Sequence, residues 1–467
     1  MKAVARNSES KVRSISVIGL GKLGLPLAVC WASRGFDVIA VDLNSKILEA
    51  VKDGRNPYHE PMVSELLREA RSRLNFTNDS EYATENSDAT FIVVPTPSNP
   101  DGSFSTRYIE QAAVPIGRAL RRKSSFHVVT VTSTVLPGSM GRVIGPLIEE
   151  TSGREMGKDF GLCYNPEFIA LGDVVRGLLE PDFILIGECN KRSGDVLSGM
   201  YRPFCQKNPP IARMSLWNAE LAKIALNVYV TAKITFANDL AAICEKMPTG
   251  NVDVVCNAMG LDSRIGSKYL MGGLSYGGPC FPRDNRAFSF TAQQLGCRAD
   301  FSLAIDTLNR HHTDRIVTEV AQRLDSSNDS AVSVLGLTYK PNTDIIEESA
   351  AINIVIGLSK LEIRVRVFDP VGMKSAEGFL GQNILRTSTV QDCLHESDFC
   401  IIATPLDQFK RLDPSTFLNE MRHAIILDCW RILDEQKFTN QEGVEYLRLG
   451  IHGQETEGPE VEVSPMA

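Results

Sequence analysis

The sequence predicts an α/β protein in which two Rossmann-like, doubly wound domains are joined by a long central helix. Three observations predict this class. A glycine-rich turn separates a β-rich run from a helical pattern near the start of the chain, and a similar succession of strand, turn, helix and strand returns after residue 330. Between them, the segment from Met214 to Met247 contains no glycine or proline, so a helix of about 50 Å can form there.

The first glycine-rich turn has the spacing of a dinucleotide-binding fingerprint. It lies in a strand, turn, helix and strand succession at 14–18, 19–24, 25–33 and 36–41. Gly19, Gly21 and Gly24 allow the backbone and the helix N-terminus to approach a pyrophosphate. Asp42 ends the second strand, where a carboxylate binds the ribose hydroxyls. This charge repels a 2′-phosphate, so NAD is favoured over NADP.

Later β-rich runs continue the alternation of a doubly wound sheet. They cover 89–94 and 127–131 and end in polar residues that should face the cofactor crevice. The run at 183–187 is predicted to be the last strand of this domain. The residues expected to bind the cofactor are Gly19, Gly21, Lys22, Leu23, Gly24, Asp42, Lys46, Thr96 and Thr134.

A cysteine in a tight turn is the candidate nucleophile. Cys280 lies in Ser275-Tyr-Gly-Gly-Pro-Cys-Phe-Pro-Arg-Asp284, where Arg283 and Asp284 follow it closely. A nearby cation favours the thiolate, the reactive form of a cysteine. On local sequence alone, a small structural residue in a turn fits equally well.

Three polar residues outside this turn are further candidates. Lys223 and Asn227 stand four apart on the predicted central helix, so they share a face and could converge on an oxyanion. A solvated surface pair is the simpler explanation for them. Glu167 follows a short β run and could face the crevice, although a surface turn acid fits as well.

The C-terminal part of the chain repeats the opening plan. A helical segment reaches about residue 325, and a β run, a glycine turn, a helix and a strand ending at Asp369 follow, over 333–335, 336–340, 349–361 and 364–368. The glycine fingerprint is missing, which indicates a different ligand. Two more β runs cover 398–403 and 424–428.

Composition limits the classes of partner. The net charge of −8 argues against a nucleic-acid or anionic-membrane surface. No run approaches the roughly 20 apolar residues of a membrane span and no signal peptide is recognisable, so a cytoplasmic protein is expected. The 11 cysteines form no Cys-x-x-Cys pair and the seven histidines no His-x-x-x-His pair, and we predict neither disulfides nor a metal.

Six motifs in this order resemble the nucleotide-sugar 6-dehydrogenase family from about Ile15 to Asp434, most closely its UDP-glucose branch. They are Gly19-Leu-Gly-Lys-Leu-Gly-Leu-Pro26, Ser133-Thr-Val135 with Pro137-Gly138, Asn165-Pro-Glu-Phe168, Lys223 with Asn227, Arg264-Ile-Gly266, and Gly277-Gly-Pro-Cys-Phe-Pro-Arg-Asp284. The resemblance implies oxidation of a sugar 6-hydroxymethyl to a carboxylate with two NAD, UDP-glucose giving UDP-glucuronate. It also implies a homodimer whose active site is completed across the interface, with higher oligomers left open.

The resemblance assigns roles to individual residues. It implies that Cys280 forms a thiohemiacetal and then a thioester, and that Asp284, with a water held by Thr134, transfers protons. Lys223 and Asn227 would stabilise negative charge, and Glu167 would assist hydrolysis. The residues it implies for substrate binding are Glu167, Phe168, Lys223, Asn227, Arg264, Tyr269, Gly277 and Lys340. Arg264 would reach the neighbouring subunit's substrate, and Lys340 would meet the UDP.

Several positions depart from the family pattern at the edges of the ligand sites. Glu347 replaces a common arginine, Trp430 replaces an arginine beside Arg431, Phe183 follows Pro-Asp in place of arginine, and Met271 stands where lysine is frequent. GDP-mannose and UDP-N-acetylhexosamine therefore stay open as substrates. So do a non-catalytic nucleotide-binding protein and a two-electron hydroxy-acid dehydrogenase. Gly273-Leu-Ser-Tyr-Gly277 matches a serine-hydrolase elbow, but no strand precedes it.

These observations predict five parts. They are a flexible N-terminus at 1–10, an NAD-binding Rossmann domain at 11–210, a central helical dimerisation domain with the cysteine loop at 211–325, a C-terminal nucleotide-sugar-binding domain at 326–454, and a flexible tail at 455–467.

Overall fold

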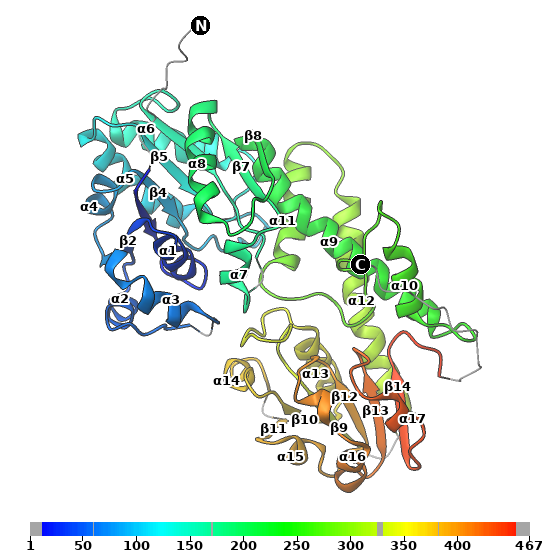
Figure 1. Cartoon of the computed structure of the whole chain (residues 1–467). Helices are drawn as coiled ribbons and strands as arrows, with labels where there is room; N and C mark the ends of the chain where they lie inside the picture. Colours follow the sequence, from blue (N-terminus) through cyan, green and yellow to red (C-terminus); the bar gives the residue numbers. More distant parts are fainter. Residues whose placement is uncertain (1–11, 59, 170, 325–329, 382, 454–467) are drawn as a thin grey trace, which may run out of the picture. The chain divides into compact units, whose positions relative to one another are not determined.

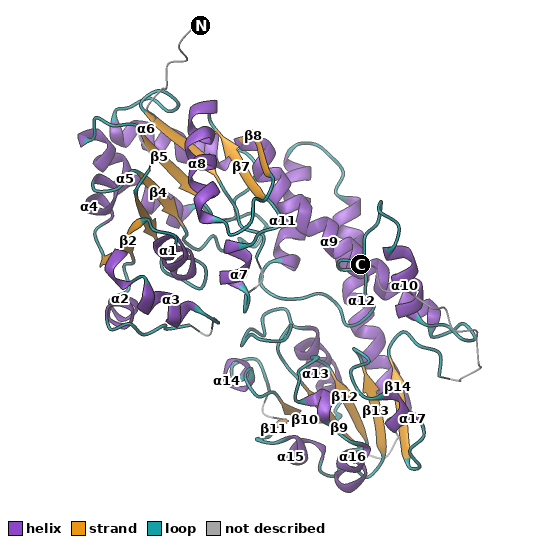
Figure 2. Cartoon of the chain, in the orientation of Figure 1, coloured by secondary structure: helices purple, strands orange, loops and turns teal. Residues whose placement is uncertain are grey.

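A computed structural model describes residues 12–58, 60–169, 171–324, 330–381 and 383–453 (Figure 1). The segments predicted to be flexible, 1–10 and 455–467, lie outside the described residues. The chain divides into two compact units, Met1–Leu226 with Phe290–Cys297, and Asn227–Ser289 with Arg298–Ala467. Each unit contains one sheet covered by helices on both faces (Figure 2).

The first unit is built on a sheet with the strand order β3-β2-β1-β4-β5-β6-β7-β8. Its strands are β1 (Ser14–Ile18), β2 (Asp37–Val41), β3 (Leu74–Thr77), β4 (Ala89–Ile92), β5 (His127–Val131), β6 (Phe160–Tyr164), β7 (Ile184–Glu188) and β8 (Ile211–Ser215). The pairs are parallel except that β7 runs antiparallel to β6. Six of these strands follow the dinucleotide-binding order 3-2-1-4-5-6, which confirms the predicted class.

The helices of this unit pack on both faces of the sheet. They are α1 (Gly24–Ser33), α2 (Ser45–Lys52), α3 (Val63–Glu69), α4 (Ser80–Glu85), α5 (Arg107–Arg122), α6 (Gly145–Ser152), α7 (Val174–Leu179) and α8 (Lys191–Phe204), with short turns η1 (Arg71–Arg73) and η2 (Met140–Ile144). Side chains of α1, α3, α7 and α8 form the core on one face, and those of α4, α5, η2 and α6 form it on the other. Trp31 of α1 is fully buried and stacks on Phe204 of α8, with ring centroids 3.9 Å apart.

The strand near 183–187 was wrongly predicted to be the last of its domain. It forms β7, and β8 pairs beside it in register from Ile184 and Ile211. The first sheet therefore continues past residue 210. Strand β8 consists of partly exposed residues at a sheet edge and contains Arg213, so it lacks the apolar run by which a buried strand is recognised.

The second unit contains the C-terminal sheet, ordered β11-β10-β9-β12-β13-β14 and parallel throughout its described pairs. Its strands are β9 (Ala331–Leu335), β10 (Arg364–Phe368), β11 (Ile384–Arg386), β12 (Phe399–Ile402), β13 (Ala424–Asp428) and β14 (Val444–Arg448). The covering helices are α13 (Ala350–Lys360), α14 (Met373–Ala376), α15 (Val390–Leu394), α16 (Pro414–Glu420) and α17 (Glu435–Thr439), with the turn η3 (Phe409–Arg411). This confirms the second Rossmann-like domain.

The two sheets repeat one structural plan at their first crossover. The amide of Gly19 donates to the Val41 carbonyl at 2.8 Å, and the amide of Gly336 donates to the Phe368 carbonyl at the same distance. Both glycines have positive φ, +97° and +94°. The repeat predicted after residue 330 is thus present at the level of individual backbone hydrogen bonds.

Helix α9 (Leu216–Cys244) forms where the segment without glycine or proline predicted it. It carries Lys223 near its start and Asn227 one turn later, and the boundary between the two units falls between these residues. The helices that follow in the chain are α10 (Val252–Gly260), α11 (Phe281–Gln294) and α12 (Asp300–Arg323). The predicted helical segment after the cysteine is therefore two helices, α11 and α12.

Candidate active site

The three glycines of the first turn differ in the space available for a side chain, as expected for a dinucleotide-binding turn. A Cβ on Gly19 would lie 2.3 Å from the Val93 carbonyl oxygen, and one on Gly24 would lie 1.9 Å from the Gly19 oxygen. A Cβ on Gly21 would meet nothing within 4 Å. Two glycines are therefore needed for the fold of the turn, whereas the middle one leaves the backbone open to a ligand, and this arrangement fits a bound pyrophosphate.

Asp42 lies at the carboxyl end of β2, beside this turn. Its Oδ2 accepts a 2.8 Å hydrogen bond from the Leu20 amide, and its Oδ1 accepts one of 2.8 Å from the Asn44 amide. The carboxylate is thereby held at the turn, as a ribose-binding acid must be. Burial, and then the charge of Asp42, raises the pKa of Tyr58. That hydroxyl therefore stays a neutral hydrogen-bonding group beside the carboxylate.

The other predicted cofactor residues lie around the same end of the sheet. Thr96 is buried, and its Oγ1 donates at 2.8 Å to the carbonyl oxygen of Thr134, which joins the loops after β4 and β5. Lys46 is exposed in the first turn of α2, where its amide donates to the Asn44 cap. Lys22 is exposed and Leu23 is partly buried between the glycines. Binding of NAD by these individual residues stays a prediction.

Glu167, Phe168 and Lys223 form a cluster in the first unit. The buried Lys223 donates from Nζ to the Glu167 carbonyl oxygen at 2.7 Å, and the same nitrogen lies 4.5 Å from the centre of the Phe168 ring. Lys223 is 7% exposed, so it is not the solvated surface residue that its sequence context allowed. Phe183, one of the departures from the family pattern, packs against Phe168 with the rings tilted by 34° and their centroids 4.9 Å apart.

The Glu167 side chain is enclosed by aromatic and polar neighbours. The Tyr201 hydroxyl of α8 has two acceptors, Glu167 Oε1 at 3.3 Å and Asn165 Oδ1, and its single proton is shared between them. Burial raises the pKa of Glu167 to about 7, and the Tyr201 hydrogen bond and the Lys223 charge oppose that rise. A carboxyl group with this pKa can exchange a proton at neutral pH. Sequence reasoning missed Tyr201, which has no local motif and lies 34 residues from Glu167.

Asn227 and Asp284 come together in the second unit. Asn227 Nδ2 donates to Asp284 Oδ2 at 2.6 Å, and both residues are buried. The Arg283 guanidinium lies 3.6 Å from the other Asp284 oxygen. Thr231, one turn after Asn227 on α9, bonds Asn285 of α11 at 3.1–3.2 Å. Helices α9 and α11 are therefore joined by polar side chains at two successive turns, which fixes the residues that follow Cys280.

Cys280 is exposed and directly precedes α11. The Asp284 amide donates to the Cys280 carbonyl at 2.9 Å, the first bond of this helix. Of the 11 cysteines, Cys280 and Cys297 are exposed and the others are buried or partly buried. A helix N-terminus favours negative charge on a group placed there. Exposure and position thus distinguish Cys280 from the packing cysteines.

The cysteine loop is held against the carboxyl ends of the second sheet. A Cβ on Gly277 would lie 2.1 Å from the Glu348 oxygen, one on Gly278 2.6 Å from the Tyr339 ring, and one on Gly273 2.7 Å from the Trp430 ring. The Gly278 amide also donates to the Glu347 carbonyl at 3.0 Å. Each glycine therefore permits a close contact that a larger residue would prevent. Lys340 follows Tyr339 at this edge and is partly exposed.

Tyr269 and Arg264 lie on the loop after α10. Tyr269 is exposed and its ring contacts that of Phe281, next to Cys280, in an edge-on arrangement with centroids 6.4 Å apart. Arg264 is exposed and pairs with Asp262 at 2.6 Å. Met271 is also exposed on this loop, at 53%. The role of Arg264 across a subunit interface stays a prediction.

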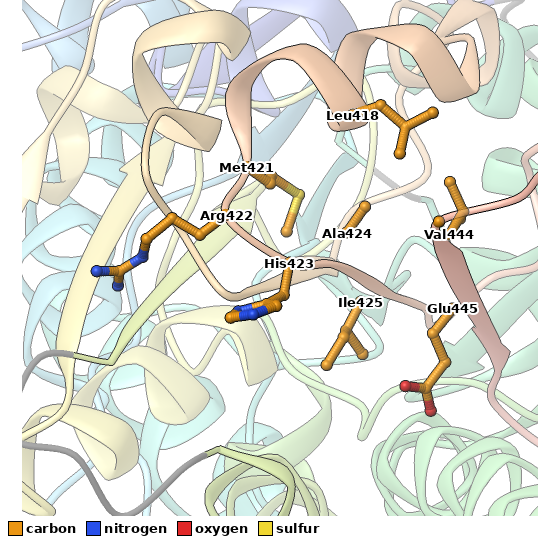
Figure 3. A pocket seen from close by; sticks show the side chains of 9 residues that line it. Leu418, Met421, Arg422, His423, Ala424, Ile425, Val444 and Glu445 are labelled. Atoms are coloured by element: carbon orange, nitrogen blue, oxygen red, sulfur yellow. The ribbon is translucent and has the colours of Figure 1, made fainter.

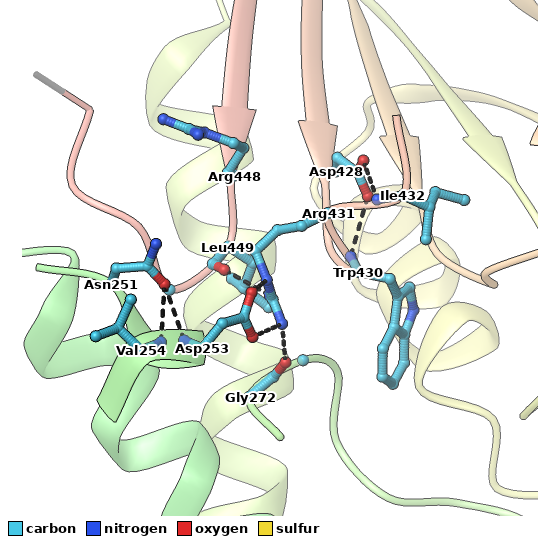
Figure 4. A network of polar contacts seen from close by, with 12 residues as sticks. Asn251, Asp253, Val254, Gly272, Asp428, Trp430, Arg431, Ile432, Arg448 and Leu449 are labelled. Carbon is cyan, nitrogen blue, oxygen red and sulfur yellow. Dashed lines mark hydrogen bonds and ion pairs between the residues drawn. The ribbon is translucent and has the colours of Figure 1, made fainter. Parts of the chain in front are cut away.

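Trp430 and Arg431 occupy the carboxyl end of β13 (Figure 4). Arg431 binds Asp253 through two bonds of 2.7 and 2.9 Å and donates to the carbonyls of Gly272 and Leu449, both at 2.7 Å. The Arg431 guanidinium thus connects the end of β13 to α10 and to the loop at Gly272. Trp430 donates from its indole nitrogen to the Ala403 carbonyl at 2.9 Å, so an aromatic surface stands where the family pattern has an arginine.

A pocket of about 450 Å³ lies at the amino ends of β13 and β14 (Figure 3). It is lined by apolar side chains such as Met421 and Ile425 together with Arg422, His423 and Glu445. In open α/β sheets, ligands bind at the carboxyl ends of the strands, whereas this pocket surrounds the amino ends. It therefore lies at the other end of this sheet from Trp430 and Arg431.

Among the described residues, no group of three or more His, Cys, Asp or Glu side chains could hold a metal ion. The absence of a metal stays a prediction. Within the same part of the chain, no helix has the length and apolar character needed to cross a membrane.

An NAD-type cradle, a second Rossmann-like domain and an exposed cysteine at a helix start define the class of a dinucleotide-dependent dehydrogenase. Family models agree along the chain. Residues 13–205 match the NAD binding domain of the UDP-glucose/GDP-mannose dehydrogenase family, 217–311 its central domain, and 333–435 its UDP binding domain. The chain belongs to this family and is an NAD-dependent dehydrogenase.

Individual relatives cover most of the chain. UDP-glucose 6-dehydrogenase AglM of Haloferax volcanii is 36% identical over 439 residues, 93% of this chain and 99% of that protein. GDP-mannose 6-dehydrogenase of Pseudomonas aeruginosa is 36% identical over 361 residues, 76% of this chain and 80% of that protein. The solved UDP-glucose dehydrogenase of Pyrobaculum islandicum aligns with a TM-score of 0.84 and 34% identity, covering 96% of this chain and 100% of that one.

Proposed function

We propose that the protein oxidises the C6 hydroxymethyl of UDP-glucose to a carboxylate, forming UDP-glucuronate through a covalent intermediate on Cys280. The observation that carries this proposal is an exposed thiol at the start of α11, one helical turn before a buried aspartate that is hydrogen-bonded to Asn227. A two-electron dehydrogenase has no use for such a thiol. The match to the UDP binding domain of the family and the similarity to UDP-glucose 6-dehydrogenases support UDP as the nucleotide of the substrate.

The first stage converts the alcohol to an aldehyde. Asp284, with a water held by Thr134, accepts the hydroxyl proton while the C6–H bond breaks. The oxidation removes four electrons in total as two hydrides, and NAD supplies the acceptor for each. Lys223 is buried, so a positive charge on it stabilises the alkoxide more strongly than an exposed lysine would.

The second stage uses the thiol. The Cys280 sulfur bonds to the aldehyde carbon, and the carbonyl oxygen becomes the hydroxyl of a thiohemiacetal. Loss of the remaining C6–H as hydride, with the hydroxyl proton, leaves a thioester. Asn227 and Lys223 supply the N–H groups that stabilise the oxyanion in these steps. The aldehyde stays attached to the protein between the two oxidations.

Hydrolysis completes the reaction. Glu167 takes a proton from the attacking water, and the C–S bond breaks to give the carboxylate and to restore the Cys280 thiol. The pKa of about 7 that burial gives Glu167 supports this role, because both of its protonation states are populated at neutral pH. Lys340 and Tyr269 contribute to binding the nucleotide sugar.

We further propose that the protein functions as a dimer, with Arg264 completing the partner's site. Three large side chains are exposed along α9 at intervals of seven residues, namely Tyr229 at 60%, Phe236 at 48% and Ile243 at 53%. An apolar stripe on a helix supports an interface with another chain. Sedimentation of wild type against Phe236→Glu tests this: a dimer that dissociates in the variant supports it, and a monomeric wild type contradicts it.

The decisive experiment counts NADH formed per nucleotide sugar consumed. Two NADH per UDP-glucose, with UDP-glucuronate as the product, support the proposal, and one NADH contradicts the thioester route. Replacing UDP-glucose by GDP-mannose or by UDP-N-acetylhexosamines in the same assay tests which nucleotide sugar is the substrate. GDP-mannose is the second candidate, because a GDP-mannose 6-dehydrogenase is as identical to the chain over its matched region as the UDP-glucose enzyme.

A further inference from the structure

The loop after β5 contains an unusually constrained turn. Gly138 adopts φ +97°, and a Cβ there would lie 2.7 Å from the Trp217 ring of α9. The helical segment that starts at Met140 follows directly. Thr134 lies in the same loop, four residues before this glycine.

Glu220 of α9 binds this turn through both carboxylate oxygens. Oε2 accepts the Gly138 amide and Oε1 accepts the Met140 amide, each at 2.7 Å. These N–H groups lie at the beginning of a helix, where backbone donors lack intrahelical partners. Glu220 is fully buried. Burial raises its pKa to about 7, and the two amide hydrogen bonds oppose the rise.

A carboxylate is suited to this place because both facing groups are donors. A glutamine would offer an oxygen to one amide and its own NH₂ to the other, so one buried amide would lose its acceptor. Trp217 stands three residues before Glu220 on the same side of α9, and Arg142 stacks on it with 4.6 Å from the guanidinium to the ring centre. The turn is thus held by packing and by hydrogen bonds from one helical face.

The same stretch of α9 reaches the neighbouring loop. Lys223, three residues after Glu220, donates to the Glu167 carbonyl in the loop after β6. From the other side, Thr96 donates to the Thr134 carbonyl. One turn of α9 therefore connects the loop that carries Thr134 with the loop that carries Glu167.

We infer that Glu220 is a positioning residue that fastens the turn at Gly138–Met140 to α9 and so places Thr134 relative to Lys223 for proton transfer. This role rests on the proposed function, in which Thr134 holds the water beside the reacting hydroxyl. Glu220 itself contacts backbone amides, and it acts through the loop.

The test compares Glu220→Gln with Glu245→Gln. Glu245 follows α9 at its other end, pairs with Arg315 at 2.6 Å and accepts the Gly450 amide at 2.7 Å, so it is a similarly bound carboxylate away from Thr134. We expect Glu220→Gln to lower kcat about 10- to 100-fold. KM for NAD should change by a smaller factor than kcat, because Gly21 and Asp42 are untouched and Thr134 is one of several residues expected to bind the cofactor. Glu245→Gln should lose thermal stability but keep kcat. Equal kcat in the two variants overturns the inference.

A double-mutant cycle with Thr134→Ala separates positioning from general damage. If Glu220 acts through Thr134, the double variant is no slower than the slower single variant. If the two losses multiply, Glu220 acts independently and the inference fails. Gly138→Ala disturbs the same turn without changing the carboxylate, and it should reproduce the kcat loss should Glu220→Gln not fold. Unchanged kcat in Gly138→Ala also counts against the inference.

Hydrogen exchange provides a readout that needs no substrate. The amides of Gly138 and Met140 should exchange faster in Glu220→Gln than in wild type and Glu245→Gln, and equal exchange overturns the inference. If wild type forms no NADH with any nucleotide sugar, the proposed function fails. The exchange measurement then still decides whether Glu220 holds the turn.

Discussion

Asn227 donates a 2.6 Å hydrogen bond from its amide to the carboxylate of Asp284, and both side chains are buried. This bond fixes the orientation of the Asn227 amide, since a carboxylate can accept but cannot donate. The NH₂ group has a second N–H, which is available to a developing oxyanion. Asp284 in turn is held in one rotamer by Asn227 and by the nearby Arg283 guanidinium. The pair therefore presents a carboxylate and an amide donor in a fixed geometry.

Asn227→Asp replaces the donor by a second carboxylate at almost unchanged shape. Two buried carboxylates at this distance cannot both ionise, so one pKa must rise. A group whose pKa is raised in the folded protein stabilises it at low pH, and that stability is lost as pH rises. We expect the variant to be destabilised by about 3 kcal/mol at pH 8 and by clearly less at pH 5, in urea unfolding at both values. A deficit independent of pH would contradict the pairing.

Glu167 should give the reaction a pH dependence near its pKa of about 7. As a general base it acts when ionised, so the rate of the hydrolysis step should rise as pH increases through 7. Glu167→Gln should slow that step about 100-fold and remove this dependence. The measurement is NADH formation from pH 5.5 to 8.5 under conditions where hydrolysis limits the rate. Persistence of the same inflection in Glu167→Gln would assign it to another group.

Tyr201→Phe provides a second test of whether the inflection near pH 7 belongs to Glu167. The Tyr201 hydroxyl donates to Glu167 Oε1 at 3.3 Å and lowers the Glu167 pKa. Removing that bond should move the inflection to higher pH while leaving it present. The folded protein prefers protonated Glu167 relative to an unfolded chain, so the stability that this group contributes is present below pH 4.5 and should be lost as pH rises from 4.5 through about 7. An unchanged or lowered inflection in Tyr201→Phe would contradict the proposed environment.

The sequence predicted those parts of the site that depend on local pattern. The glycine turn with Asp42, the helix from Leu216 and the cysteine loop are each contiguous, so spacing and turn chemistry suffice. Contacts that depend on tertiary folding were not predictable in this way. Tyr201 reaches Glu167 from a helix whose sequence has no distinguishing motif. Strand β8 at the sheet edge has no apolar run and was missed.

Glu220 was missed for a different reason. It lies three residues before Lys223, so helical spacing could have placed it on a neighbouring part of the same face. Its partners, however, are backbone amides of Gly138 and Met140, and such partners leave no complementary side chain in the sequence. A carboxylate between the apolar residues Ala219 and Leu221 of a central helix is the signal that could have drawn attention to it, because burying an unpaired charge is costly.

Gly278 should be needed for contact with Tyr339 as well as for its backbone conformation. It has φ +81°, and a Cβ would lie 2.6 Å from the Tyr339 ring. Gly296 has φ +71°, but a Cβ there would meet nothing within 4 Å, so Gly296→Ala measures backbone strain alone. We expect Gly296→Ala to cost about 1 kcal/mol with kcat retained, and Gly278→Ala to cost more and to lower kcat. Equal behaviour of the two variants would show that the ring contact is unimportant.

Cys280→Ser tests the covalent step, with Cys297→Ser as the control because both cysteines are exposed. A serine hydroxyl is a much weaker nucleophile than a thiolate at neutral pH, so the variant should stop before the second oxidation. We expect overall NADH formation to fall by about 10³-fold or more, while NAD binding, measured by titration, stays within about twofold because the glycine turn is unchanged. Cys297→Ser should retain wild-type turnover. Mass spectrometry of wild type quenched during turnover should find the sugar attached at Cys280, and full turnover by Cys280→Ser would refute its role as nucleophile.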